Sequence, residues 1–183
     1  MLARPVRVTE ALECSALTLE AQSALVAKSG DSISFFVVAL ALAGSAGLAG
    51  DKGAAEEGGK SVALRIELSK DEIHNSYSNL TLRFKYFFAR KVMFIKYAVA
   101  YVILPGGYGT MDECFEALNL ILTEKSRTFP VIFVGKDYWK GLIQWIETTA
   151  VKAGTLSPRD MEIFQVIDDP VKVVKAIKKV VVW

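Results

Sequence analysis

The chain has 183 residues, 52% of them hydrophobic, with 22 basic and 20 acidic residues and a formal net charge of +2. This length predicts a single domain, residues 1–183, with a sizeable core. The small net charge argues against a nucleic-acid partner or binding to a membrane surface. The two cysteines, Cys14 and Cys114, have neither metal-ligand spacing nor the pattern of a disulfide framework. We therefore expect reduced, packed thiols in a cytoplasmic protein. We also expect no metal and no other cofactor, because no ligand cluster or cofactor motif is visible in the sequence.

The first third of the chain predicts a helix at residues 17–28, a strand at 32–42 and a short helix at 51–57. No signal peptide is apparent. Residues 33–49 are almost wholly apolar, but Ser34, Ser45 and several glycines interrupt the run. A membrane span needs about 20 apolar residues. We therefore interpret the run as a buried parallel strand that leads into a glycine turn, and we expect no membrane partner.

Strands and helices alternate along the rest of the chain. Strand patterns occur at residues 61–68, 98–104, 129–134 and 164–167, and helical patterns at 80–96, 110–122, 138–151 and 170–180. This alternation predicts an α/β sandwich with a mainly parallel sheet. The last helix carries a basic face, which we interpret as solvated surface, formed by Lys172, Lys175, Lys178 and Lys179.

Two glycine-rich turns follow strands, one at residues 44–47 and one at 106–109. In a parallel sheet both turns lie at the carboxyl edge, where ligands bind, so they could line one cleft. In the second turn Gly106, Gly107 and Gly109 let backbone N–H groups approach a ligand closely and adopt positive φ where needed. A helix that opens near Thr110 adds free N–H groups and the positive end of its dipole. This arrangement predicts a phosphate site, with a carboxylate one turn further on.

Several of these residues also have a structural interpretation. Thr110 and Glu113 have the spacing of a capping box, in which both side chains would bond to backbone N–H groups. Arg90 and Lys91 could lie on a solvated helix face. Glu116 is either beside the ligand or exposed, and Tyr108 either covers the ligand or packs the turn. His74, the only histidine, has no partners at the spacing of a catalytic triad or metal site and is interpreted as a surface residue.

The string from Pro105 to Glu113, Pro-Gly-Gly-Tyr-Gly-Thr-Met-Asp-Glu, resembles the PGGxGTxxE motif of the Lonely Guy family, whose members are often named "lysine decarboxylase". Residues 90–93, Arg-Lys-Val-Met, match a second element of that family. Residues 66–77 look like a degraded third element, and the likeness extends over about residues 60–167. No pyridoxal-phosphate lysine motif is visible, so the decarboxylase name carries little weight.

The resemblance implies a Rossmann-like three-layer fold and a homodimer that hydrolyses the N-glycosidic bond of a purine or cytokinin nucleoside 5′-monophosphate. The products are a free base and ribose 5-phosphate. It further implies that Glu113 and Arg90 are the catalytic pair. A carboxylate can stabilise an oxocarbenium-like state or act as a base, and an arginine can bind phosphate or keep the carboxylate ionised. The residues expected to bind substrate phosphate are Gly106, Gly107, Tyr108, Gly109, Thr110 and Lys91.

Residues 1–60 diverge from the family pattern. Cys14 and Leu17 stand where the family has the glycine and arginine of a GSAR-like turn around Ser15. A second turn, around Gly44 and Gly47, only approximates the family's glycine run. This region, including Ser15, Gly44 and Gly47, is expected to form the other half of the nucleotide site. Its changes leave open an impaired enzyme, a non-catalytic nucleotide or phosphate-ligand binder like the molybdenum-cofactor carriers, or an assembly protein that keeps only the dimer.

Overall fold

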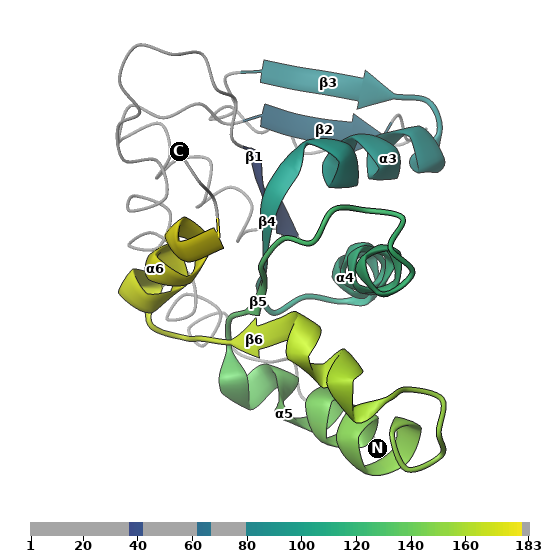
Figure 1. Cartoon of the computed structure of the whole chain (residues 1–183). Coiled ribbons are helices and arrows are strands. Elements are labelled where there is room, and N and C mark those ends of the chain that lie inside the picture. The colour runs from purple at the N-terminus through teal and green to yellow at the C-terminus, as the bar shows by residue number, and fades with distance from the viewer. Residues whose placement is uncertain (1–36, 42–61, 67–79, 181–183) are drawn as a thin grey trace, which may run out of the picture.

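The computed structural model describes residues 37–41, 62–66 and 80–180 (Figure 1). The helices expected at 17–28 and 51–57, the glycine turn at 44–47 and His74 lie outside the described residues. So do most of the apolar run at 33–49 and the string around Ser15.

The main sheet has four strands, in the order β1-β4-β5-β6, and every neighbouring pair is parallel. The strands are β1 (Val37–Ala41), β4 (Ala98–Ile103), β5 (Val131–Phe133) and β6 (Phe164–Val166). The prediction of a parallel sheet is therefore confirmed. Three of the predicted strands are longer than the observed ones because residues at their ends belong to the connecting loops.

Two further strands, β2 (Val62–Ile66) and β3 (Leu80–Phe84), form a separate parallel pair. The prediction of a continuous helix over residues 80–96 is wrong at its start. Leu80, Leu82 and Phe84 alternate with Thr81 and Arg83, which is the period of a strand. The helix begins only afterwards, as α3 (Phe87–Tyr97).

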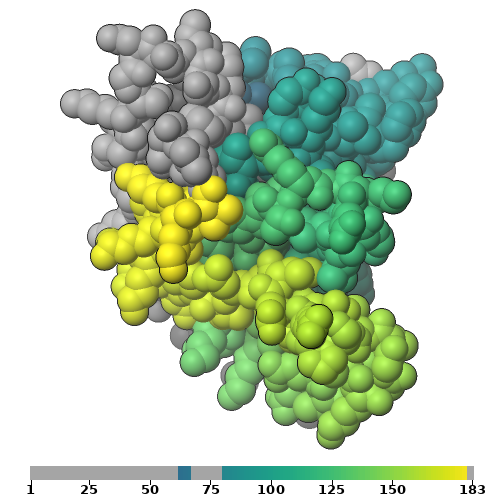
Figure 2. Space-filling model, in the orientation of Figure 1, coloured from purple at the N-terminus to yellow at the C-terminus, as the bar shows by residue number. Residues whose placement is uncertain are grey.

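Four helical regions follow α3 in the described part of the chain, up to residue 180. They are α4 (Tyr108–Leu122), α5 (Lys136–Trp145) continuing into a π-helical turn (Ile146–Ala150), a 3-10 helix (Pro158–Ile163) and α6 (Pro170–Val180). Ser157 and Asp160 form a capping box at the 3-10 helix, and Pro158 is its first residue; both are typical signals of a helix start. In the view of Figure 2 the segment around residue 150 forms the lower end of the molecule.

The sheet is buried on both faces, and the helices form a layer on each side of it (Figure 1). On one face Tyr101, Ile103 and Phe133 pack against α3, α4 and α5. On the other face Val102 and Ile132 pack against α6. Alternate residues of β4 and β5 therefore belong to different cores, which explains why these strands are apolar at almost every position.

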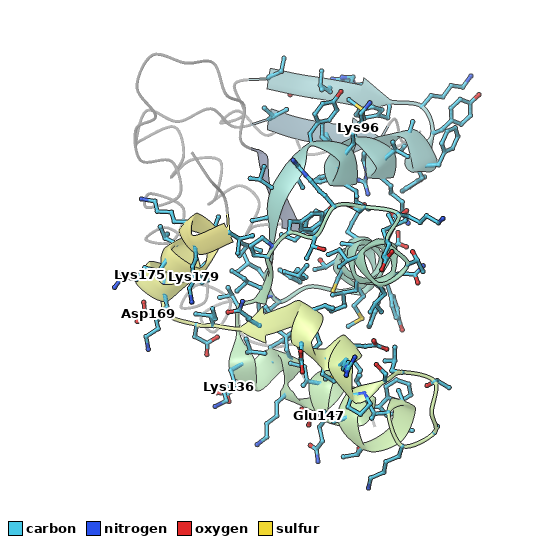
Figure 3. The ribbon with its side chains drawn as sticks, viewed as in Figure 1. Lys96, Lys136, Glu147, Asp169, Lys175 and Lys179 are labelled. Carbon is cyan, nitrogen blue, oxygen red and sulfur yellow. The ribbon has the colours of Figure 1, made fainter. Side chains whose placement is uncertain are left out.

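The lysine face of α6 is exposed, as expected of solvated surface, and Figure 3 labels Lys175 and Lys179 on it. In the part of the chain that the structure describes, none of the helices combines the length and the apolarity needed to cross a membrane.

Candidate functional site

The carboxyl ends of β4, β5 and β6 meet at one edge of the sheet, and the loops that follow them are bonded to one another. The carboxylate of Asp168, after β6, accepts hydrogen bonds from the N–H groups of Gly135 and Lys136, at 2.7 Å and 3.0 Å. The hydroxyl of Tyr138 donates to the carbonyl of Gly106, in the loop after β4, at 2.7 Å. The glycine turn after β4 is therefore held from the side by the first turn of α5, the helix that follows β5.

Helix α4 begins directly in this glycine turn. Gly107 is its N-cap residue, no side chain caps the helix, and the first backbone bond runs from the Met111 N–H to the Gly107 carbonyl. The N–H groups of residues 107–110 therefore have no acceptor inside the helix. Residues 107–109 are exposed, so the N–H groups of these three residues and the positive end of the helix dipole are accessible to an anion.

The helix starts at Tyr108, two residues before the predicted start, and this excludes the capping box. Thr110 is the third helical residue rather than the N-cap residue. Its side chain is buried, and its hydroxyl has no hydrogen-bond partner among the described residues. Glu113 bonds to another helix instead of to the start of its own.

The three glycines of the turn have different roles, and none of them has a positive φ. A Cβ on Gly106 would lie 2.7 Å from the Cβ of Thr110, so only glycine lets the Thr110 side chain lie against the turn. A Cβ on Gly107 or Gly109 would meet no atom within 4 Å. At these two positions glycine is not required by the backbone conformation. Its lack of a side chain leaves open space next to the backbone.

The catalytic pair implied by the resemblance forms an ion pair that joins α3 to α4. The Arg90 Nη2 atom lies 2.5 Å from the Glu113 Oε1 atom, and the two side chains are 20% and 9% exposed. The rings of Phe87 and Phe94 flank the guanidinium, with centroids 5.6 Å and 5.9 Å from its central carbon. Burial raises the pKa of Glu113, and the charge of Arg90 opposes that rise.

One polar atom of each side chain in this ion pair has no hydrogen-bond partner within the described residues. The Arg90 Nε and Glu113 Oε2 atoms are both buried and unbonded, and so is the hydroxyl of Tyr101 on β4. Burial raises the pKa of Tyr101, and the negative charges of Glu113 and Glu116 raise that pKa further. Sequence reasoning missed Tyr101. The available signal was a hydroxyl in an otherwise apolar strand.

Lys91, expected to bind phosphate, lies in a second link between α3 and α4. Its Nζ atom is 2.8 Å from the Asp112 carboxylate and 3.3 Å from that of Glu116. The hydrogen bond that Lys91 donates to the Asp112 carboxylate is the main cause that raises the pKa of Lys91. The ammonium group therefore already has two acidic partners, and Glu116 belongs to this link.

The remaining predicted residues are dispersed. Tyr108 is 92% exposed and does not pack the turn. Cys114 is a buried free thiol on α4 whose pKa burial raises to about 12. Ser15, Gly44 and Gly47 lie outside the described residues, so their place beside the turn at 106–109 stays a prediction. Tyr138, which contacts the turn, is a further residue that sequence analysis did not single out.

The parallel sheet, its helical layers and the glycine turn at the carboxyl edge define a Rossmann-like α/β protein. The molybdenum cofactor carrier protein MCP from Chlamydomonas reinhardtii has a similar structure, with a TM-score of 0.60 and 16% identity over 92% of this chain and 88% of that one. At this identity the likeness concerns the fold alone.

Residues 49–177 match the family described as "Possible lysine decarboxylase", a name that Lonely Guy proteins carry. The match covers more than half of the chain, so the chain belongs to this family. A comparison with curated proteins finds no significant match.

Proposed function

We propose that the protein hydrolyses the N-glycosidic bond of a purine or cytokinin nucleoside 5′-monophosphate to a free base and ribose 5-phosphate. The observation that carries this proposal is the Arg90–Glu113 ion pair, one turn beyond the uncapped start of α4. Membership of the Lonely Guy family supports the same assignment.

The phosphate would bind to the free N–H groups at the start of α4, where the hydroxyl of Thr110 is a further donor. This binding would place the ribose towards Glu113, three residues along the helix. Because the site uses the phosphate as its anchor, the nucleoside without phosphate is expected to react far more slowly.

In the reaction the bond between C1′ and the base nitrogen breaks, which leaves positive charge on the ribosyl ring. The Glu113 carboxylate stabilises that charge and accepts a proton from water as the hydroxyl adds to C1′. The proton then passes to the departing base nitrogen. Arg90 opposes the rise in the pKa of Glu113 that burial causes, and it holds the Oε1 atom, which leaves Oε2 for the water.

The test is to incubate the protein with adenosine monophosphate and with an isopentenyladenine ribotide, and to measure free base and ribose 5-phosphate. Glu113→Gln preserves the size of the side chain and is expected to reduce turnover at least 100-fold, as is typical of a general base. Glu147→Gln, at an exposed position on the π-helical turn (labelled in Figure 3), is the matched control and should remain active. Equal turnover by both variants would contradict the role of Glu113.

A second candidate is a non-catalytic binder of a nucleotide or another phosphate ligand, as the name of the Chlamydomonas protein suggests for that protein. One observation favours it. The Glu113 side chain is only 9% exposed and is already bonded to Arg90, whereas residues 107–109 are exposed. Binding of adenosine monophosphate without product, in the wild type and in Glu113→Gln alike, would support this candidate and exclude the hydrolase.

We also propose a homodimer. Three apolar side chains of α3 (Phe87, Phe88 and Val92) are more than half exposed, which is unusual for a surface helix and typical of an interface. Light scattering on the purified protein should give twice the chain mass, and Phe88→Glu should shift it towards the monomer. A wild-type monomer at micromolar concentration would contradict the proposal.

A further inference from the structure

The glycine turn is bonded to a residue of the next helix, and this contact has no part in the chemistry proposed above. Tyr138 lies in the first turn of α5, and its side chain is half exposed. Even so, its hydroxyl donates to the carbonyl of Gly106 at 2.7 Å. Because the acceptor is a backbone carbonyl, this hydrogen bond constrains the turn itself.

The constraint acts on one peptide group. The Gly106 carbonyl and the Gly107 N–H belong to the same peptide bond, and no cis peptide occurs in the described part of the chain. In a planar trans peptide these two groups point in opposite directions. A hydrogen bond that holds the carbonyl towards α5 therefore turns the Gly107 N–H away from α5. Gly107 is the N-cap residue of α4, where an anion would bind.

Tyr138 is itself held in place by its surroundings. Gly135, the N-cap residue of α5, has a φ of +99°, and Asp168 accepts hydrogen bonds from its N–H and from the next one. The ring of Tyr138 packs edge-on against Trp139, with centroids 4.8 Å apart. Trp139 is buried and donates its indole N–H to the Val134 carbonyl. The hydroxyl of Tyr138 is thus presented from a rigid base.

A second observation at the same turn points to a ligand. The hydroxyl of Thr110 is buried, in a residue only 4% exposed, and has no partner among the residues that the structure describes. It lies against Gly106, the residue whose carbonyl Tyr138 holds. A donor without a partner beside a row of free N–H groups suits a phosphate oxygen.

We propose that Tyr138 is a positioning residue, which orients the Gly106–Gly107 peptide so that the Gly107 N–H points at the phosphate of the ligand. The inference rests on the proposed phosphate site and not on the hydrolytic step. Tyr138 does not touch the reacting atoms, so it should affect binding much more than the rate of the chemical step.

The test uses Tyr138→Phe, which keeps the ring on Trp139 and removes only the hydroxyl. Tyr97→Phe, at another half-exposed tyrosine, is the matched control. Inorganic phosphate and adenosine monophosphate are titrated by calorimetry, and the Gly107 amide is followed by NMR. We expect about fivefold weaker binding of both ligands, the effect of one lost hydrogen bond. KM should rise by the same factor, with kcat within about twofold and the melting temperature unchanged.

The Gly107 amide resonance of ligand-free Tyr138→Phe should also move, because the orientation of the peptide is no longer fixed. A change in that resonance would not result from a role in stability alone. Unchanged affinity together with an unchanged Gly107 resonance would overturn the inference, as would a loss of kcat at constant KM.

The outcomes separate the inference from the proposed function. If the wild type binds phosphate but releases no base, and Tyr138→Phe binds about fivefold more weakly, the hydrolase proposal fails and the inference stands. If both proteins hydrolyse the nucleotide with the same KM, the inference fails and the hydrolase stands. A wild type that binds neither phosphate nor adenosine monophosphate overturns the inference.

Discussion

Gly106→Ala is the sharpest test of how the glycine turn is built. The new Cβ would lie 2.7 Å from the Thr110 Cβ and 3.1 Å from its Cγ2, and closer still to its hydroxyl oxygen. Ordinary contacts begin at 3.4 Å, so the two Cβ atoms must separate by at least 0.7 Å (3.4 − 2.7). Rotation about χ1 leaves the Cβ atom of Thr110 in place, so a change of rotamer cannot relieve the contact between the two Cβ atoms. The turn or the start of α4 must therefore move.

Forcing extra atoms into packed structure costs about 1–3 kcal/mol, and a shift of backbone at a helix start puts Gly106→Ala near 2 kcal/mol. For a chain of this length that corresponds to a fall in melting temperature of roughly 4–8 °C. Gly109→Ala is the control. Its Cβ meets no atom within 4 Å, and it lies inside α4, so it should be neutral or stabilise by up to about 1 kcal/mol.

The assay is urea unfolding followed by circular dichroism, with a double-mutant cycle that includes Thr110→Ala. That substitution removes the Oγ1 and Cγ2 atoms and leaves only the Cβ contact. Gly106→Ala should therefore cost about 1 kcal/mol less in the Thr110→Ala background. The same cost in both backgrounds, or a Gly106→Ala variant as stable as Gly109→Ala, would refute the reasoning.

Three further predictions concern stability. Burial raises the pKa of Glu113 above its ordinary value of 4.5, so the folded state holds this proton more tightly than the unfolded state. The contribution of Glu113 to the unfolding free energy is therefore fully present below pH 4.5 and is lost as the pH rises through the raised pKa. The unfolding free energy of the wild type minus that of Glu113→Gln should accordingly fall with rising pH. A difference that rises instead would mean that Arg90 outweighs burial. Tyr101→Phe removes a buried hydroxyl without a partner in the described part of the chain, so denaturant unfolding should show unchanged or slightly higher stability, and a loss above about 1 kcal/mol would reveal a partner. Asp168→Ala removes both hydrogen bonds that the Asp168 carboxylate accepts at the start of α5, so the unfolding free energy should fall by about 1 kcal/mol and the Gly135 amide should exchange faster. Amide exchange at Gly135 as slow as in the wild type would contradict this role of Asp168.

The sheet and most helices could be predicted because they depend on local patterns. β4 is a continuous apolar run and α4 has a clear helical period, and the structure confirms both. The start of α3 could not be predicted in this way. Residues 80–84 have the alternation of a strand, but the helical pattern after them conceals it, and pairing with the distant β2 decides the result.

The candidate site, too, has parts that local sequence predicts and parts that only distant contacts decide. The string from Pro105 to Glu113 by itself identified the turn, the helix after it and the acidic residue, because strand, glycine and helix signals follow one another without a gap. Sequence could not decide between a capping box and a cross-helix ion pair for Glu113, since both fit the same spacing. Only the packing of α3 on α4 brings Arg90, 23 residues earlier, to within 2.5 Å of that carboxylate.

The sequence by itself therefore determined the family, the parallel α/β class and the residue types of the site, because each depends on neighbours along the chain. Tertiary structure alone decided which of these residues meet. It paired Lys91 with Asp112 and Glu116, packed Tyr101 into the same core as α4, and brought Tyr138 to the Gly106 carbonyl. Such contacts arise from the packing of whole elements, whose relative positions no local pattern specifies.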